Sequence, residues 1–194
     1  MRLRLRSLII KIKNTKDRKI RHGDVIRDVE YLEHADIKDG IIDLSIIEFP
    51  LVVVLTQDCD LAQDYKFRWS RAEVKNEDKY LLSVLVAPMY NYEHVIKGEH
   101  LSEIEMGMTV LSAGSATLIQ KIQDNEIPRY HYLEFPSSTN IVPTIIDFKH
   151  YFSVPTKYLK SHKANNFECQ IAPVNREDLQ QRFSSFLSRI ALPD

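Results

Sequence analysis

VVVLTQDCDLAQD, residues 52–64, begins with four apolar residues and ends with three carboxylates around one cysteine. An apolar run of this kind predicts a central β-strand that is covered on both faces. Charged side chains cannot be buried without partners, so we expect the chain to turn sharply within residues 58–60. We also expect the carboxylates of that turn to accept hydrogen bonds from nearby backbone N–H groups.

The turn is also a candidate functional site, because a strand that ends in polar residues brings them to the rim of a sheet, where ligand sites form. The rim residues are Thr56, Gln57, Asp58, Cys59 and Asp60. Asp58 and Asp60 can hold a divalent metal ion through oxygen ligands, or one of them can cap the turn. We favour the capping role and predict neither a metal nor a cofactor.

Cys59 has a separate interpretation as a nucleophile that a base, His131, would activate. The two flanking aspartates oppose this role, because like charge disfavours the thiolate. The cysteine-hydrolase hypothesis stays open because the sequence does not give the distance between the two side chains. The two cysteines and seven histidines have no paired spacing of the kind found in zinc motifs.

The composition is that of one globular domain, with 194 residues of which 44% are hydrophobic and 27% charged. We expect a soluble protein, since no apolar run approaches the roughly 18–20 residues that span a bilayer. The basic N-terminus lacks the apolar core of a secretion signal. Two distant cysteines make no disulfide framework, so a cytoplasmic location is predicted.

Positive charge is concentrated at the N-terminus. Residues 1–21 carry nine Lys or Arg against one acid, about +8, and the whole chain carries −1, so the other residues carry about −9. Arginines can follow a phosphate backbone and a tryptophan can stack on a base. The nucleic-acid-binding candidates are Arg2, Arg4, Arg6, Arg21, Arg68, Trp69 and Arg71. The alternative is that the basic segment pairs with the chain's own acidic body.

Periodicity predicts a chain rich in short strands, with few helices. A short helix is expected at residues 115–123, and residues 65–78 are loop-like. The C-terminal helix is expected at residues 174–191, with Asn175 as its N-cap and Arg182 and Arg189 in surface ion pairs. The predicted strands are residues 2–12, 25–31, 41–48, 51–55, 80–87, 129–135, 145–148, 152–154 and 167–171.

These elements predict an α+β fold, a mainly antiparallel, barrel-like sheet with the C-terminal helix packed on it. We expect one domain over residues 1–194. Its parts are a basic N-terminal strand or arm (1–22), a β-rich body (23–172) and the C-terminal helix (174–191).

The order of GDVI (23–26), LVVVLTQD (51–58) and YLLSVLVAPM (80–89) resembles small barrels of the PemK/MazF type. Proteins of that family are toxin ribonucleases of toxin–antitoxin pairs, or descendants that have lost cleavage. Where the family has Arg-Pro before the apolar strand this chain has Phe49-Pro50, so the catalytic arginine is not in its expected place. Only Thr56 fits the family's hydroxyl position. The chain also resembles uncharacterised bacterial and phage proteins with a Ser/Thr-Gln-x-Cys-Asp turn.

The leading hypothesis is a PemK/MazF-like protein that binds RNA or single-stranded nucleic acid, either as an endoribonuclease or as a non-cleaving descendant. Arg21, Thr56, Asp58 and Asp60 would line its site. The competing hypothesis is a non-catalytic partner subunit of a toxin–antitoxin or phage-defence assembly, whose basic arm docks on an acidic protein partner. No membrane partner is predicted.

Overall fold

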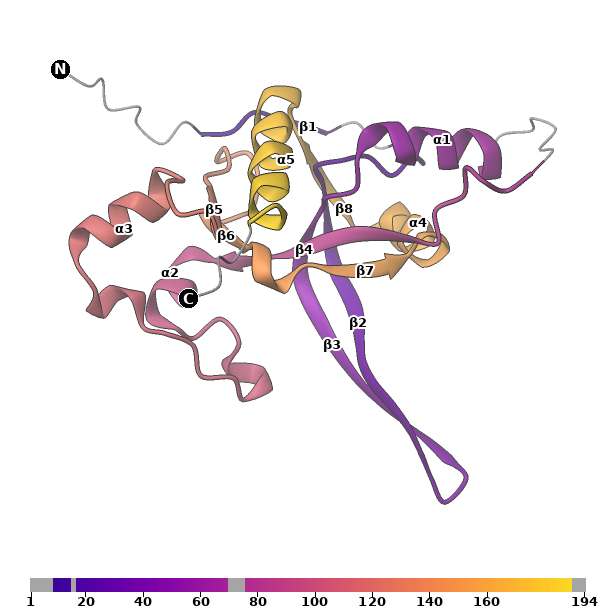
Figure 1. The fold of residues 1–194 in the computed structure, drawn as a ribbon, viewed down its shortest axis with the longest axis horizontal. Coiled ribbons are helices and arrows are strands. Elements are labelled where there is room, and N and C mark those ends of the chain that lie inside the picture. Colours follow the sequence, from indigo (N-terminus) through magenta and orange to yellow (C-terminus); the bar gives the residue numbers. More distant parts are fainter. Residues whose placement is uncertain (1–8, 15–16, 70–75, 190–194) are drawn as a thin grey trace. The chain divides into compact units, whose positions relative to one another are not determined.

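The structure is a computed structural model that describes residues 9–14, 17–69 and 76–189. Figure 1 shows its helices and strands in chain order. The strands are β1 (Ile12–Lys13), β2 (Asp24–Lys38), β3 (Ile41–Val54), β4 (Ser83–Asn91), β5 (Tyr130–Leu133), β6 (Thr144–Asp147), β7 (Phe152–Pro155) and β8 (Phe167–Ile171). The α-helices are α1 (Asp58–Trp69), α2 (Tyr92–Lys97), α3 (Ala116–Gln123), α4 (Thr156–Asn166) and α5 (Pro173–Leu187). Single 3₁₀ turns are η1 (Ser102–Ile104), η2 (Leu111–Ala113) and η3 (Phe148–His150).

The strands form one hydrogen-bonded sheet in the order β1-β8-β2-β3-β4-β6-β5, with β7 also paired to β4. The pairings whose register is described are antiparallel. The predicted α+β class with an antiparallel, curled sheet is therefore confirmed. None of the helices in the described ranges is long and apolar enough to cross a membrane.

The chain divides into two compact units that are interleaved in sequence. The hairpin unit contains residues 14–88 and 151–169, and the C-terminal-helix unit contains residues 1–13, 89–150 and 170–194. Strands β4 and β8 each begin in the hairpin unit and end in the other.

The core of the hairpin unit is built around the end of β3. Val52, Val53 and Val54 have no exposed surface. Val53 pairs with Val25 of β2 on one side and with Ala87 of β4 on the other, so the apolar run is a central strand, as predicted. Val52 and Val54 belong to a hydrophobic cluster that also contains Ile20, Ile26, Val29, Leu61, Val84, Val86, Val154 and Leu159.

Strands β2 and β3 form a long hairpin that extends away from α1 and α4 of the same unit (Figure 1). Lys38 pairs with Ile41, which leaves a two-residue loop of Asp39 and Gly40. Both loop residues have positive φ, 53° and 78°. A type I′ turn requires this conformation, and an Asp-Gly pair favours it because glycine has no Cβ to clash.

Helix α1 corrects the sequence analysis, which predicted a loop from residue 65. The helix continues to Trp69 because its inward face is formed by Leu61 and Asp64, both buried. Asp64 accepts hydrogen bonds from Arg68 Nε and from the backbone N–H of Leu81, each at 2.8 Å. A helix that buries a paired carboxylate does not show an apolar periodicity.

The C-terminal helix packs as predicted, but it begins differently. Its N-cap is Ala172, and the Asn175 side chain instead accepts a hydrogen bond from the Lys11 N–H at 3.2 Å. Phe183 and Phe186 contact the buried ring of Phe148, with centroids 5.4 and 5.8 Å away.

Arg182 of α5 also differs from its predicted surface ion pair. It is partly buried and donates hydrogen bonds to the backbone carbonyls of Asn125, Ile127 and Tyr130. Backbone oxygens from the β5 region therefore replace the expected carboxylate partner, and Arg182 fastens the helix to that region.

Candidate functional site

The predicted turn at residues 58–60 is the first turn of α1. The Leu61 N–H donates to the Gln57 carbonyl at 3.1 Å, as at the start of an α-helix. Asp58 Oδ1 accepts from the backbone N–H of His22 at 2.8 Å, whereas Asp60 Oδ1 lies 3.6 Å from Cys59 Sγ. The prediction of a carboxylate bonded to a backbone N–H holds for Asp58, and this donor, His22, lies 36 residues away in the sequence. Carboxylates at this end of a helix are stabilised by its dipole.

Thr56 has a structural contact. Its Oγ1 accepts a hydrogen bond of 2.7 Å from the Leu85 N–H of β4. The Leu55 N–H also donates to the Leu85 carbonyl at 2.8 Å, so the Thr56 hydroxyl continues the hydrogen bonding between the two segments one residue past Leu55.

Cys59 and His131 lie in different units and have unlike surroundings. Cys59 is exposed, and its sulfur lies 3.6 Å from Gln57 Oε1 as well as from Asp60. His131 is 1% exposed, and burial lowers the pKa of its imidazole to about 3. A buried, neutral ring against Phe148 is a core residue, so the geometry gives the cysteine-hydrolase hypothesis no support.

The predicted nucleic-acid-binding residues have several outcomes. Arg21 Nη2 pairs with Asp17 at 2.5 Å. Arg68 is held by Asp64 and donates to the Leu81 carbonyl at 2.6 Å, so its charge is used inside the hairpin unit. Trp69, by contrast, is 39% exposed and lines a cavity. Arg2, Arg4, Arg6 and Arg71 lie outside the described residues.

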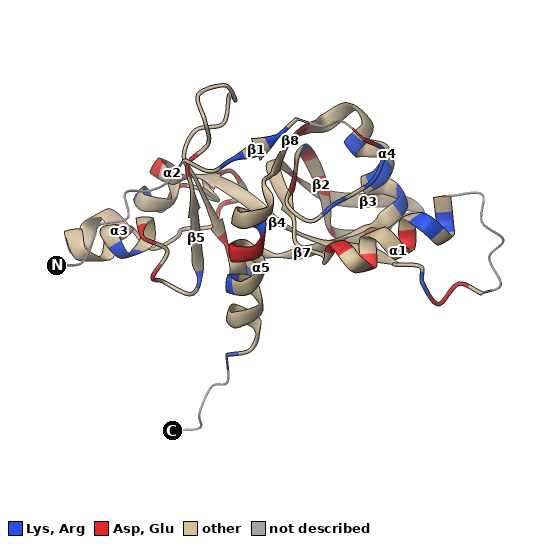
Figure 2. Cartoon of the chain, turned by 90° about the horizontal axis from the view of Figure 1, so that it is seen from above, with Lys and Arg blue, Asp and Glu red and all other residues tan. Residues whose placement is uncertain are grey.

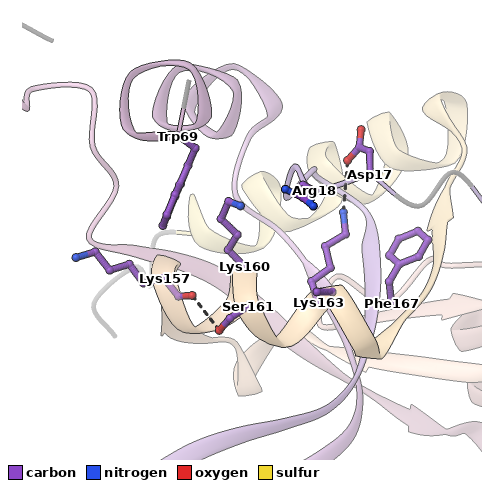
Figure 3. A pocket seen from close by; sticks show the side chains of 9 residues that line it. Asp17, Arg18, Trp69, Lys157, Lys160, Ser161, Lys163 and Phe167 are labelled. Carbon is purple, nitrogen blue, oxygen red and sulfur yellow. Dashed lines mark hydrogen bonds and ion pairs between the residues drawn. The ribbon is translucent and has the colours of Figure 1, made fainter. Parts of the chain in front are cut away.

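The cavity lies in the hairpin unit and has a volume of about 500 Å³. Its walls come from the end of α1, from α4 and from the loop before β2. Figure 2 shows Lys and Arg gathered along α4 and at the end of α1. Figure 3 shows the lining side chains, among them Asp17, Arg18, Trp69, Lys157, Lys160 and Lys163.

Lys163 is neutralised within the protein. Its Nζ lies 2.7 Å from Asp24 Oδ2 and 3.9 Å from Asp17 Oδ1, and it also donates to the Lys19 carbonyl. Burial raises the pKa of Asp24 to about 6, although the lysine opposes this rise. The pair therefore supports the loop against α4 and adds no net charge to the cavity.

The other three cations of the cavity keep their charge available. Within the described part of the chain, no carboxylate lies within ion-pair distance of Arg18, Lys157 or Lys160. Lys160 Nζ lies 4.6 Å from the centre of the Trp69 ring and 5.7 Å from that of Tyr65. The cavity combines an exposed indole with cations, an arrangement that suits an anionic aromatic ligand.

Sequence reasoning found Trp69 but missed Lys157 and Lys160, because it did not predict α4. Their spacing of three residues is a usable signal, since residues three apart share one face of a helix.

No family model, curated protein or solved structure matches this chain. The resemblance to PemK/MazF barrels therefore rests on the short motifs that suggested it, and the function has to be proposed from the geometry.

Proposed function

We propose that the hairpin unit binds single-stranded nucleic acid, in particular RNA, in the cavity between α1 and α4. The observation that carries the proposal is an exposed indole, Trp69, beside cations that have no carboxylate partner in the described part of the chain.

The chemistry of the lining residues supports a strand over a duplex. Phosphates are attracted by Arg18, Lys157 and Lys160, and a base can stack on Trp69 once the Lys160 ammonium moves to a phosphate. The volume of about 500 Å³ falls among those of small-ligand sites, which fits a nucleotide and not a double helix.

Binding without cleavage is the form we propose. Among the described residues that line the cavity, the carboxylic acid is Asp17. Burial acts to raise the pKa of Asp17, but the hydrogen bonds that it accepts from Arg21 and from the Lys19 N–H outweigh burial, so the pKa is lowered. A carboxylate held in this way is a poor general base, which fits the non-cleaving descendant of the sequence hypothesis.

The test is fluorescence anisotropy with a labelled single-stranded RNA at several salt concentrations. Trp69→Ala should weaken binding about 5- to 150-fold, the size of one lost stacking interaction. The double variant Lys157→Ala/Lys160→Ala should weaken binding at low salt and reduce the salt slope by about 1.4, at roughly 0.7 per phosphate contact.

The matched control is Lys97→Ala, which removes an exposed cation in the other unit and should leave binding unchanged. Undetectable RNA affinity at low salt, or equal affinity for the wild type and the double variant, would refute the proposal.

A second observation favours the partner-subunit hypothesis, and it concerns the β2–β3 hairpin. Ile37 pairs with Ile42 and Leu32 with Ile46, so these side chains share one face of the ribbon together with Leu44. All five are 49–70% exposed. Contiguous exposed apolar surface marks interaction sites, and a two-stranded ribbon gains little stability by itself. We propose that this face docks on an apolar surface of a second protein.

The test is co-expression with the products of neighbouring genes, followed by purification and light scattering. Ile37→Lys/Ile42→Lys should dissociate the complex, whereas Ile41→Lys, equally exposed but on the opposite face, should not. A wild-type chain that forms no complex, or a complex that survives the double substitution, would contradict this role.

A further inference from the structure

Three side chains with metal-binding atoms meet in the C-terminal-helix unit, and none of them is among the predicted site residues. They are His100, which follows α2, Asp147 at the end of β6, and His150 at the end of η3. One nitrogen or oxygen atom from each lies within 4.8 Å of those from the other two.

His150 is oriented by a hydroxyl group. Its Nδ1 lies 3.1 Å from the Tyr90 Oη, and burial raises the pKa of that phenol above its ordinary value, so Tyr90 stays neutral. If Nδ1–H donates to the phenol oxygen, Nε2 is left with a free lone pair. That Nε2 faces Asp147 Oδ2 at 3.7 Å, which is too long for a hydrogen bond. Metal-binding histidines typically use the second ring nitrogen in this way.

His100 is held by packing. Its ring lies against Tyr90, with centroids 4.7 Å apart, and 6.2 Å from the ring of His150. Neither ring nitrogen is accessible or makes a hydrogen bond of ordinary geometry to the described residues, although the His94 carbonyl is near enough to favour a protonated ring. Burial lowers the pKa of both His100 and His150.

Asp147 is fixed from the opposite side. It has no exposed surface. Arg129 donates hydrogen bonds to it, with Nε 2.9 Å from each carboxylate oxygen and Nη2 2.5 Å from Oδ2. The Lys149 N–H donates to Oδ1 at 3.0 Å. These bonds fix the orientation of the carboxylate, with Oδ2 on the side of His150 Nε2, 3.7 Å away. The nearby guanidinium weakens cation binding, and it also favours an anion as a further ligand.

We propose that His100, Asp147 and His150 bind a divalent first-row transition metal ion, with Zn²⁺ the best fit. Two imidazole nitrogens and one carboxylate oxygen make a donor set that Zn²⁺ uses with a fourth position open to water or an anion. Mg²⁺ and Ca²⁺ fit less well, because they prefer oxygen ligands alone. Zinc bonds of about 2.0–2.1 Å place tetrahedral donors roughly 3.3 Å apart, so donor atoms that now lie within 4.8 Å of one another need to approach by up to about 1.5 Å.

The experiment titrates the metal-free full-length chain with Zn²⁺ in a calorimeter and with Co²⁺ in a spectrophotometer. The expected result is one equivalent bound, with the intense visible absorption of tetrahedral Co²⁺. His100→Gln and His150→Gln should each weaken binding more than tenfold and abolish that absorption. Tyr90→Phe, which removes only the orienting hydroxyl, should weaken binding about 10- to 100-fold.

His34→Gln, an exposed histidine of the hairpin, is the matched control and should bind like the wild type. Circular dichroism verifies that each variant is folded. If a histidine variant does not fold, the loss of metal affinity in Tyr90→Phe still tests the site. Failure of the wild type to bind either metal would overturn the proposal. Equal binding by the wild type and by His100→Gln/His150→Gln would overturn it as well, because the metal would then be held elsewhere.

Discussion

Removing the amino group of Lys163 should destabilise the protein strongly, and more at high pH than at low pH. Lys163 is 3% exposed and its partner Asp24 is 1% exposed, so Lys163→Met leaves a buried carboxylate without its counter-charge. Breaking a buried pair in this way costs about 3–5 kcal/mol. The effect is large because burial disfavours the ionised form of Asp24 even with the lysine present: its pKa is about 6, above the ordinary value of 3.8.

The pH dependence follows from the direction of that shift. The folded-state pKa of Asp24 lies above its unfolded value, so the folded state binds the proton more tightly. The resulting stability is fully present below about pH 3.8 and is lost as pH rises through the folded-state pKa, about 6 in the wild type and higher in the variant. Lys163→Met should therefore lose less stability at pH 5 than at pH 8.

Urea denaturation, followed by circular dichroism at pH 5 and pH 8, measures how much the free energy of unfolding falls in Lys163→Met. Asp24→Asn/Lys163→Met has no group to titrate and should recover part of the stability at pH 8. Lys157→Met, on the exposed face of the same helix, should cost less than about 0.5 kcal/mol. The reasoning fails if Lys163→Met costs under about 1 kcal/mol at both pH values, or if the double variant is no more stable than the single one.

Three further predictions concern Asp58, His131 and Arg182, with Asp60→Ala and Arg189→Met as comparisons. Asp58→Ala should cost about 1 kcal/mol by removing the acceptor of a backbone N–H, while Asp60→Ala should change stability little; equal urea midpoints would contradict this. His131 has its pKa lowered to about 3, so its neutral form stabilises the fold above about pH 6.5 and this contribution is lost as pH falls. In His131→Leu the free energy of unfolding should therefore fall less steeply between pH 6 and 4, by up to about 1.4 kcal/mol per pH unit. An unchanged slope would show that the imidazole of the wild type is not both buried and neutral. Arg182→Met should lower the free energy of unfolding by about 1–3 kcal/mol, because partly buried carbonyls lose their donor. Arg189→Met should cost under about 0.5 kcal/mol, and similar losses for the two variants in thermal denaturation would argue against the Arg182 contact.

The strands could be predicted from sequence better than the helices, because apolar and β-branched runs mark the buried strands directly. Residues 167–171 form β8 as predicted, and residues 52–54 lie at the centre of the sheet. Helix α4 has no such mark. Its buried positions are Thr156, Leu159 and Lys163, and a face with one aliphatic residue does not show helical periodicity.

The candidate sites depended on contacts that spacing cannot show. Trp69 was predicted from its residue type, but the lysines beside it belong to the unpredicted helix α4. The meeting of His100 with Asp147 and His150 has no sequence motif, because nearly fifty residues separate His100 from Asp147. Such a cluster is created by the pairing of β4 with β6 and by the loops around them, so only the fold reveals it.

The interleaving of the two units constrains how the chain can fold during synthesis. The hairpin unit is complete only when residues 151–169 have left the ribosome, and the C-terminal-helix unit only when residues 170–194 have followed. Strand β1 must wait for β8, since Ile12 pairs with Ile171. No single break between residues 14 and 169 yields a fragment that holds either unit whole. Long-range pairing of this kind slows folding, and we expect refolding in the millisecond-to-second range typical of sheet proteins with distant contacts.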